Sequence, residues 1–79
     1  MRIKVIVSLK EGVLDPQGKA IQHSLATLGY REVSDVRVGK VITLEVADAE
    51  RGVLEQRAKE MCEKLLANTV IENYRIEFE

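Results

Sequence analysis

The hydrophobic residues of this 79-residue chain switch repeatedly between two spacings, and the order of these spacings limits its fold more than any other feature. A spacing of two residues is typical of a strand with one buried face, whereas a spacing of three and four residues is typical of a helix. Read from the first residue, the pattern predicts strand, helix, strand, strand, helix and strand. A chain of this length holds one domain, so we expect residues 1–79 to share a single core.

The first strand is predicted over residues 2–10, where apolar side chains alternate with mostly polar ones: Ile3, Val5, Val7 and Leu9. Gly12 ends this strand. Asp15 and Pro16 then predict the start of a helix. An aspartate side chain can accept hydrogen bonds from the free amides of the first turn, and proline loses no hydrogen bond at the first helical position.

The first helix is predicted to continue to Leu28, with Ile21, Leu25 and Leu28 facing the core. Gly29 ends it, because glycine adopts the left-handed conformation of a helix cap at little cost. Gly18 lies in the first turn of this helix, where glycine costs about 1 kcal/mol relative to alanine. A close approach of another group to the backbone would explain a glycine at this position.

A hairpin is predicted next, from two short alternating stretches at residues 35–38 and 41–46. Gly39 and Lys40 lie between them. Glycine at the first of two loop positions suits a type II′ turn, which matches the twist of paired strands, and a longer loop is the alternative.

The second helix is predicted to begin at Asp48, which would cap it, and to end near Asn68. Its expected core stripe consists of Leu54, Ala58, Met61 and Leu65, with Cys62 and Leu66 flanking it. A last strand follows, in which three large apolar residues alternate with charged ones: Tyr74, Ile76 and Phe78.

This order of elements predicts an α+β fold of the ferredoxin-like type, βαββαβ, with an antiparallel sheet and both helices on one face. So short a chain buries only about 60–65% of the surface that it exposes when unfolded, which makes its core marginal. One cysteine rules out an internal disulfide. We therefore expect the chain to gain stability from other chains, by dimerising or by exchanging strands.

The residues argue against several functions. The formal net charge is −1, and aromatic side chains that could stack bases are absent from the expected open sheet face, so the chain should bind no nucleic acid. No apolar run approaches the ~20 residues of a membrane span. One cysteine and one histidine cannot make a zinc site of about four ligands. His23 is expected to be a surface residue and Cys62 a buried apolar one.

The residues thus predict no catalytic site, and two kinds of non-catalytic protein remain open. One is a subunit that acts by holding protein partners. The other is a small-molecule-binding regulatory module of ferredoxin-like fold. Stabilisation by a metabolite would favour the second, and stabilisation by protein partners alone would favour the first.

Three segments, in order and spacing, resemble PurS, the family of small subunits of phosphoribosylformylglycinamidine (FGAM) synthase. They contain the sequences L-D-P-Q-G from Leu14, D-V-R-V-G-K from Asp35 and C-E-K-L-L-A-N from Cys62. The resemblance covers essentially the whole chain. It implies a part in de novo purine biosynthesis, in an enzyme that converts formylglycinamide ribonucleotide to formylglycinamidine ribonucleotide.

The resemblance also implies partners. They are a glutaminase subunit that releases ammonia from glutamine and a synthetase subunit that uses ATP and Mg²⁺, and the small subunit joins the two and assists ammonia transfer. It implies further copies of this chain as a homodimer or homotetramer, no cofactor bound by the chain itself, and a cytoplasmic location.

Candidate residues for contact with these partners lie in two of the motifs, at the predicted ends of elements. They are Asp15, Pro16, Gln17 and Gly18 at the start of the first helix, and Arg37, Gly39 and Lys40 at the predicted hairpin. Turn geometry at Gly39 and a solvated strand end at Arg37 and Lys40 explain these three residues equally well.

Overall fold

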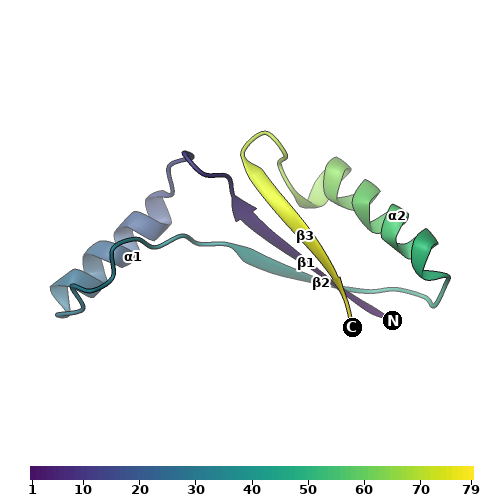
Figure 1. Cartoon of the computed structure of the whole chain (residues 1–79), viewed down its shortest axis with the longest axis horizontal. Coiled ribbons are helices and arrows are strands. Elements are labelled where there is room, and N and C mark those ends of the chain that lie inside the picture. The colour runs from purple at the N-terminus through teal and green to yellow at the C-terminus, as the bar shows by residue number, and fades with distance from the viewer.

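The structure is a computed structural model that describes residues 1–79 (Figure 1). Its elements are β1 (Arg2–Leu9), α1 (Pro16–Thr27), β2 (Lys40–Glu45), α2 (Arg51–Met61), the π-helical turn η1 (Cys62–Leu66) and β3 (Glu72–Phe78). The three strands form one antiparallel sheet in the order β2-β1-β3. The predicted α+β class is therefore confirmed, and the arrangement is ferredoxin-like.

The central strand β1 pairs with both neighbours, and its register places Val5 opposite Ile42 on β2 and Ile76 on β3. The alternation predicted for this strand is confirmed, because Ile3, Val5 and Val7 are all buried on one face. The side chains between them lie on the other, open face, as expected from a period of two.

The core lies between this sheet face and the helical segment formed by α2 and η1. Ile3 packs with Leu54 and Ala58, and Val5 and Val7 pack with Cys62 and Ala67. Apolar residues of β2 and β3 surround both clusters: Ile42, Leu44, Tyr74, Ile76 and Phe78. Only one of the two helices thus covers the sheet.

The start of α2 differs from the prediction. Asp48 does not cap the helix. Its carboxylate instead lies 3.1 Å from the N-terminal ammonium, and α2 begins after Glu50, which makes no side-chain cap. The first turn of α2 instead contacts β3, where the Arg51 guanidinium lies 4.7 Å from the centre of the Phe78 ring.

The core stripe of α2 is also corrected near its end. Leu54, Ala58 and Cys62 are buried, whereas Leu65, which was expected in the stripe, is 82% exposed. The π turn explains this, because hydrogen bonds to the fifth residue place more residues in each turn and rotate the following side chains about the axis. Leu66 therefore packs against the core in place of Leu65.

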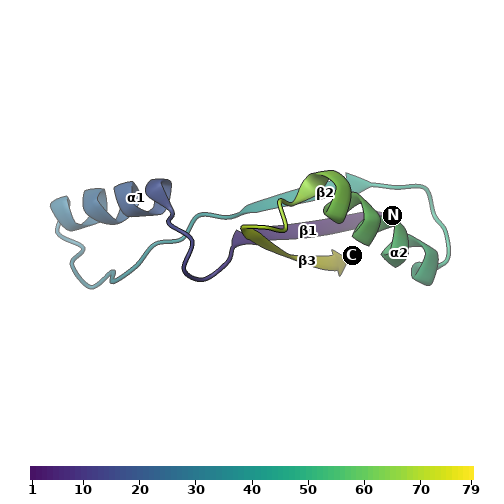
Figure 2. The same ribbon diagram turned by 90° about the horizontal axis from the view of Figure 1, so that it is seen from above.

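Helix α1 lies beyond the end of the sheet and does not cover its face (Figures 1 and 2). The radius of gyration is 16.1 Å, whereas a compact domain of this length has about 11.6 Å. We call α1 and the segment that returns beside it, residues 16–38, the arm. The prediction that both helices lie on one sheet face is wrong for the single chain.

The predicted hairpin is wrong for a related reason. Residues 35–38 form no strand, and Gly39 and Lys40 form no turn, because the chain runs from the arm directly into β2. The amides of Val36 and Val38 bond to aspartate side chains, not to a neighbouring strand. The outer edge of β2 is left without a partner.

Both ends of α1 are as predicted. The Asp15 carboxylate accepts a hydrogen bond from the Gly18 amide at 2.8 Å, and Pro16 is the first helical residue. Gly29 follows the helix with a φ of +102°, and the amide of Tyr30 donates to the Leu25 carbonyl at 2.9 Å. This is the hydrogen-bond pattern of a Schellman cap.

Candidate functional site

Two segments of the chain connect the arm to the sheet. We call residues 10–15, which lead from β1 to α1, the leaving passage, and residues 36–39, which lead back to β2, the returning passage. We call these two passages, together with the adjoining residues 16–18 and Lys40, the junction. A cleft of about 550 Å³ on one side is lined by Ser8, Leu9, Glu11, Gly12, Asp35, Arg37, Val38 and Gly39. A second cleft of about 250 Å³ is bordered by residues of the same region, including Gln17, Lys40 and Glu72. The predicted contact residues from both motifs meet here.

Asp15 is the buried polar residue of the junction, only 5% exposed. One carboxylate oxygen, Oδ1, caps α1 by accepting from Gly18, and the other, Oδ2, accepts from the Val38 amide at 2.7 Å. The bonds from the Val38 and Gly18 amides hold the pKa of this carboxyl below its ordinary value of 3.8. The cap of the helix is therefore also bonded to the returning passage.

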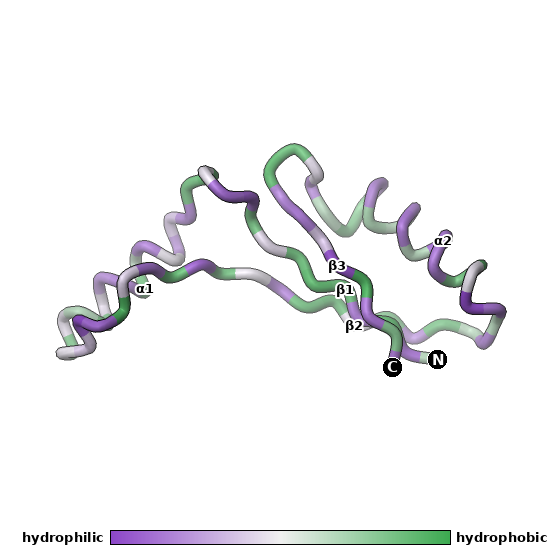
Figure 3. The backbone as a smooth tube through the Cα atoms, viewed as in Figure 1, coloured by the Kyte–Doolittle hydropathy of each residue, from purple (hydrophilic) through white to green (hydrophobic).

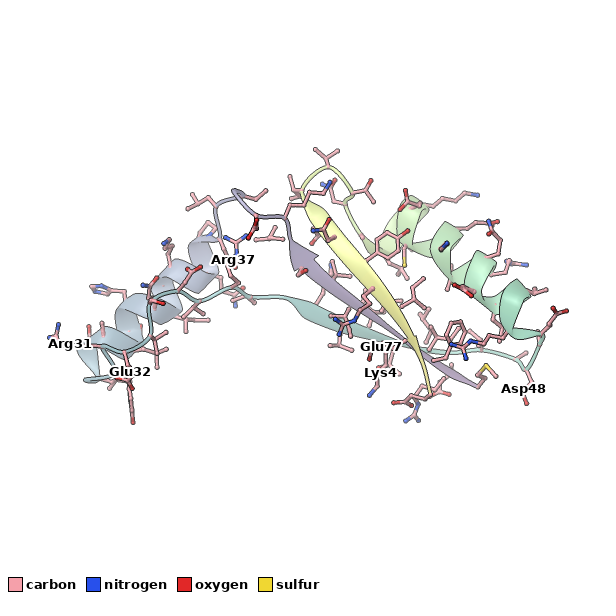
Figure 4. The ribbon with its side chains drawn as sticks, viewed as in Figure 1. Lys4, Arg31, Glu32, Arg37, Asp48 and Glu77 are labelled. Carbon is pink, nitrogen blue, oxygen red and sulfur yellow. The ribbon has the colours of Figure 1, made fainter.

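Arg37 makes the opposite connection, from the returning passage to the leaving one (Figure 4). Its Nη1 donates to the Val13 carbonyl at 2.7 Å, and its Nη2 donates to the Lys10 carbonyl at 3.0 Å. A guanidinium carries several donors in a rigid plane, which suits it to hold two carbonyl groups at once.

Two glycines allow the passages to pack closely. A Cβ atom on Gly18 would clash with the Val36 carbonyl oxygen, and a Cβ atom on Gly39 would lie 2.7 Å from the Val7 carbonyl oxygen. The backbone approach expected at Gly18 is therefore confirmed, and the approaching group belongs to the same chain. Gly39 allows close packing against β1, in place of the turn that was predicted for it.

The other predicted contact residues at the junction are exposed. Pro16 and Gln17 face solvent in the first turn of α1, and Lys40 faces solvent at the start of β2. Asp15 and Gly18 are buried, whereas Arg37 and Gly39 are exposed as well. The Arg37 donors are bonded to this chain's own carbonyls, so the exposed side chains that are free of such bonds are those of Pro16, Gln17 and Lys40.

A second surface was not identified from the sequence. A groove of about 420 Å³ lies beside α2 and is lined by Leu44, Arg57, Glu60, Met61, Lys64, Leu65 and Leu66. It follows the side of the sheet where β2 has its open edge. The helical spacing predicted Met61 and Leu65 as core residues, so the period alone could not have indicated an exposed groove.

The arm also contains apolar residues far from the core, as the hydropathy colouring of the backbone shows (Figure 3). Leu28 is 72% exposed and Ile21 is 38% exposed, although both were expected to face the sheet. Leu14 and Tyr30, at the two ends of α1, are 70% and 54% exposed.

The open face of the sheet is charged and internally paired. The Arg2 guanidinium lies 2.8 Å from the Glu45 carboxylate, and the Lys4 ammonium lies 2.8 Å from that of Glu79. The Lys4 hydrogen bond is the main cause that lowers the pKa of Glu79. Such exposed pairs contribute little to stability, and they make this face polar.

Candidate catalytic groups do not converge at either surface. His23 is exposed on the arm, and Cys62 is buried under the sheet, where burial raises the pKa of its thiol. No group of three or more His, Cys, Asp or Glu side chains is placed to hold a metal ion. Neither α1 nor α2 has the length and apolar character needed to cross a membrane.

The fold and these surfaces define a class of protein: a small antiparallel α+β subunit whose helical arm and apolar groove are built for association. Comparison with known families gives the particular one. Residues 2–79 match the PurS family, described as phosphoribosylformylglycinamidine (FGAM) synthase. The chain belongs to this family, whose members are subunits of FGAM synthase in purine biosynthesis.

Individual relatives agree. The chain is 59% identical over 78 residues to the PurS subunit of FGAM synthase of Bacillus subtilis (strain 168), covering 99% of this chain and 92% of that one. The structure of B. subtilis PurS is similar with a TM-score of 0.88, over 99% of this chain and 96% of that one, at 59% identity. A chain in the structure of PurLQS from Thermotoga maritima has a TM-score of 0.86 at 32% identity, with 96% and 93% covered.

Proposed function

We propose that this chain is the small subunit that holds the glutaminase and synthetase subunits of FGAM synthase together and assists the passage of ammonia between them. Membership of the PurS family supports the proposal, as does the similarity to a chain of PurLQS. The structural observation that carries it is the arm, which projects from the sheet with its apolar side chains uncovered by its own chain.

An uncovered arm has a physical consequence. Side chains such as Leu28 gain free energy only when another surface removes them from water, at about 25 cal/mol per Å² of apolar area. A chain with so few buried residues and such a projecting element is suited to be stabilised by partners. Rigid positioning of the partners is a task that needs no catalytic side chain.

The transfer of ammonia gives a reason for such a subunit. Ammonia that escapes into water near neutral pH becomes ammonium, which is not a nucleophile. A docked assembly that excludes water along the path keeps the reactive form. FGAM synthase is an ATP-dependent ligase, and we assign the use of ATP and Mg²⁺ to the large partner subunit, with no cofactor on this chain and the assembly in the cytoplasm.

We assign a second copy of this chain to the arm, as a homodimer or within a homotetramer. The arm of one copy would supply the second helix and the edge strand that the sheet of the other copy lacks. Helix α1 could lie in the groove beside α2, and residues 35–38, which the sequence predicts as a strand, could pair with the open edge of β2. Both faces that would meet carry exposed apolar side chains, Leu28 on the arm and Leu65 in the groove.

We assign contact with the other subunits to the junction, the region of Asp15, Pro16, Gln17, Gly18, Arg37, Gly39 and Lys40. Gln17 and Lys40 border a cleft, and with the exposed side chain of Pro16 they supply the contact surface. Asp15 and Gly18 are buried and support that surface from within.

Reconstitution tests the proposal. Glutamine-dependent formation of the amidine is measured with the two large subunits, with and without this chain, and compared with the rate on an added ammonium salt. We expect the chain to raise the glutamine-dependent rate and to leave the ammonium-dependent rate nearly unchanged. An unchanged glutamine-dependent rate would contradict the bridging role, and thermal stabilisation of the isolated chain by a metabolite would favour a regulatory module.

A further inference from the structure

We propose that Asp15 and Arg37 form a latch that holds the arm extended away from its own sheet and so commits α1 to a second copy. The part concerning the second copy rests on the association proposed above. The part concerning the direction of the arm rests on contacts within one chain.

The two residues of the latch connect the two passages in opposite directions. Asp15 lies on the leaving passage and bonds to the backbone of the returning one, through Val38 at 2.7 Å. Arg37 lies on the returning passage and bonds to the backbone of the leaving one, at Val13 and Lys10. Both side chains are charged, and hydrogen bonds from or to charged groups are about twice as strong as neutral ones.

These contacts exist only while the arm is extended. In a closed chain of the predicted ferredoxin-like form, residues 35–38 would turn back at Gly39 and lie along β2. Arg37 would then move away from Lys10 and Val13, and the Val38 amide would leave Asp15. Closing the arm therefore requires that all three hydrogen bonds break.

Close packing reinforces the hydrogen bonds. Gly18 of α1 lies against the Val36 carbonyl, and Gly39 lies against Val7 of β1, so the returning passage is closely packed at both of its ends. A hinge that opens and closes needs residues free to absorb changes of φ and ψ. Here the side chains of Asp15 and Arg37 hold the backbone of the two passages at Val38, Val13 and Lys10.

The consequence concerns the choice between two assemblies. A closed monomer and an exchanged dimer use the same contacts between α1 and the sheet, so the joining segment decides which of them forms. A latch that is compatible only with the extended arm favours the exchanged form. The residues that were predicted to contact partners would thereby set the direction of the arm.

A distance measurement within one chain tests the latch. Spin labels are attached at His23→Cys on α1 and Thr43→Cys on β2, both exposed positions, while the native Cys62 is fully buried. Labelled chain is diluted in an excess of unlabelled chain, so that pulsed electron resonance reports only the distance within one chain. Mass by light scattering is recorded on the same samples.

Two variants break the latch separately. Arg37→Lys keeps the charge but cannot hold two carbonyls in the same fork geometry. Asp15→Ser keeps a side chain that caps helices well but has a single oxygen, so the Val38 bond is lost. Asp35→Asn is the matched control, because the Asp35 side chain accepts only from the adjacent Val36 amide.

We expect a narrow distribution at long distance for the parent and for Asp35→Asn. For Arg37→Lys and Asp15→Ser we expect a broad distribution extending to shorter distances, with at least a tenfold rise in the dissociation constant of the homo-oligomer. If both variants keep the parent distribution, the latch is wrong, whatever the mass. If the parent is monomeric with its arm extended, the latch stands and the proposed association of copies fails. Circular dichroism excludes unfolding, and should Asp15→Ser not fold, Arg37→Lys decides alone.

Discussion

The carboxylate of Asp15 accepts a hydrogen bond from the backbone amide of Val38 at 2.7 Å, although the two residues are 23 positions apart. This bond joins the L-D-P-Q-G segment to the D-V-R-V-G-K segment, which the sequence presents as separate motifs. Arg37 joins them a second time in the opposite direction. The two motifs thus form one structural unit, the junction between the arm and the sheet.

Replacing Gly18 by alanine should destabilise the protein. Alanine favours a helix by about 1 kcal/mol over glycine, but here its Cβ would clash with the Val36 carbonyl, and backbone cannot move aside cheaply. We expect a net loss of about 1–3 kcal/mol in the free energy of unfolding. Urea unfolding at a fixed chain concentration measures it.

The matched control for this prediction is Gly52→Ala in α2. The nearest atom to a Cβ there is a Glu50 side-chain oxygen at 3.7 Å, which is ordinary contact. We expect no loss at Gly52, and a gain of up to about 1 kcal/mol. Equal stabilities for the two variants would contradict the close approach at Gly18.

Acid should weaken the junction. Hydrogen bonds from the Val38 and Gly18 amides lower the pKa of Asp15 in the folded chain, so its contribution to stability is complete above the ordinary value of 3.8. It is lost as the pH falls below 3.8 through the lowered pKa. Arg37 lies near enough to favour the charged carboxylate as well.

The test compares the melting temperatures of the parent and of Asp15→Asn across pH. Glu79, whose pKa is also lowered, titrates in both chains, so its effect cancels in the difference. We expect a constant difference above about pH 5 that narrows towards zero in stronger acid. A difference independent of pH would show that the charge of Asp15 plays no part.

Replacing Leu28 by lysine should disrupt the association of copies without unfolding the chain. Leu28 is 72% exposed, so the single chain loses little packing, while a covered interface would have to bury a charge. We expect the dissociation constant of the homo-oligomer to rise about tenfold or more, which corresponds to about 1.4 kcal/mol. Analytical ultracentrifugation measures it.

His23→Lys is the control on the same helix, because His23 lies on the side of α1 that faces away from Ile21 and Leu25 in the helical spacing. We expect its dissociation constant to stay within about twofold of the parent. If Leu28→Lys associates as the parent does, the apolar face of α1 is not the contact surface.

Replacing Lys40 by glutamate should weaken binding to the other subunits. Lys40 is exposed beside a junction cleft, and charge reversal at the edge of an interface acts mainly on the association rate. We expect about a tenfold lower association rate at low salt by surface plasmon resonance. Lys59→Glu on the exposed side of α2 is the control, and equal rates for both variants would exclude Lys40 from the interface.

Local signals explain how much of the fold was predictable. The alternation at Ile3, Val5 and Val7 predicted β1, because a strand with one buried face repeats every second residue. Asp15 and Gly29 predicted the ends of α1, because caps depend on the few residues next to them. The burial of Cys62 followed from its place beside an apolar stripe.

The wrong predictions concern segments whose local sequence pattern fits two different arrangements. Residues 35–38 alternate as a strand should, but a strand needs a neighbour, and in this structure these residues pair with no strand. Leu65 has the spacing of a core residue, yet the π turn before it rotates its side chain into solvent. For the candidate site, the motifs identified the residues but not the fact that they bond to each other.

The sequence by itself determined both helices and three strands, where most of them end, and that one sheet face is apolar, since these depend on spacing and on neighbours along the chain. The tertiary structure decided where the arm points, because that depends on hydrogen bonds such as Arg37 to Lys10, between residues far apart in the chain. The same apolar stripe on α1 can cover its own sheet or that of another copy. The geometry of the junction, and not the hydrophobic pattern of α1, decides between these two arrangements.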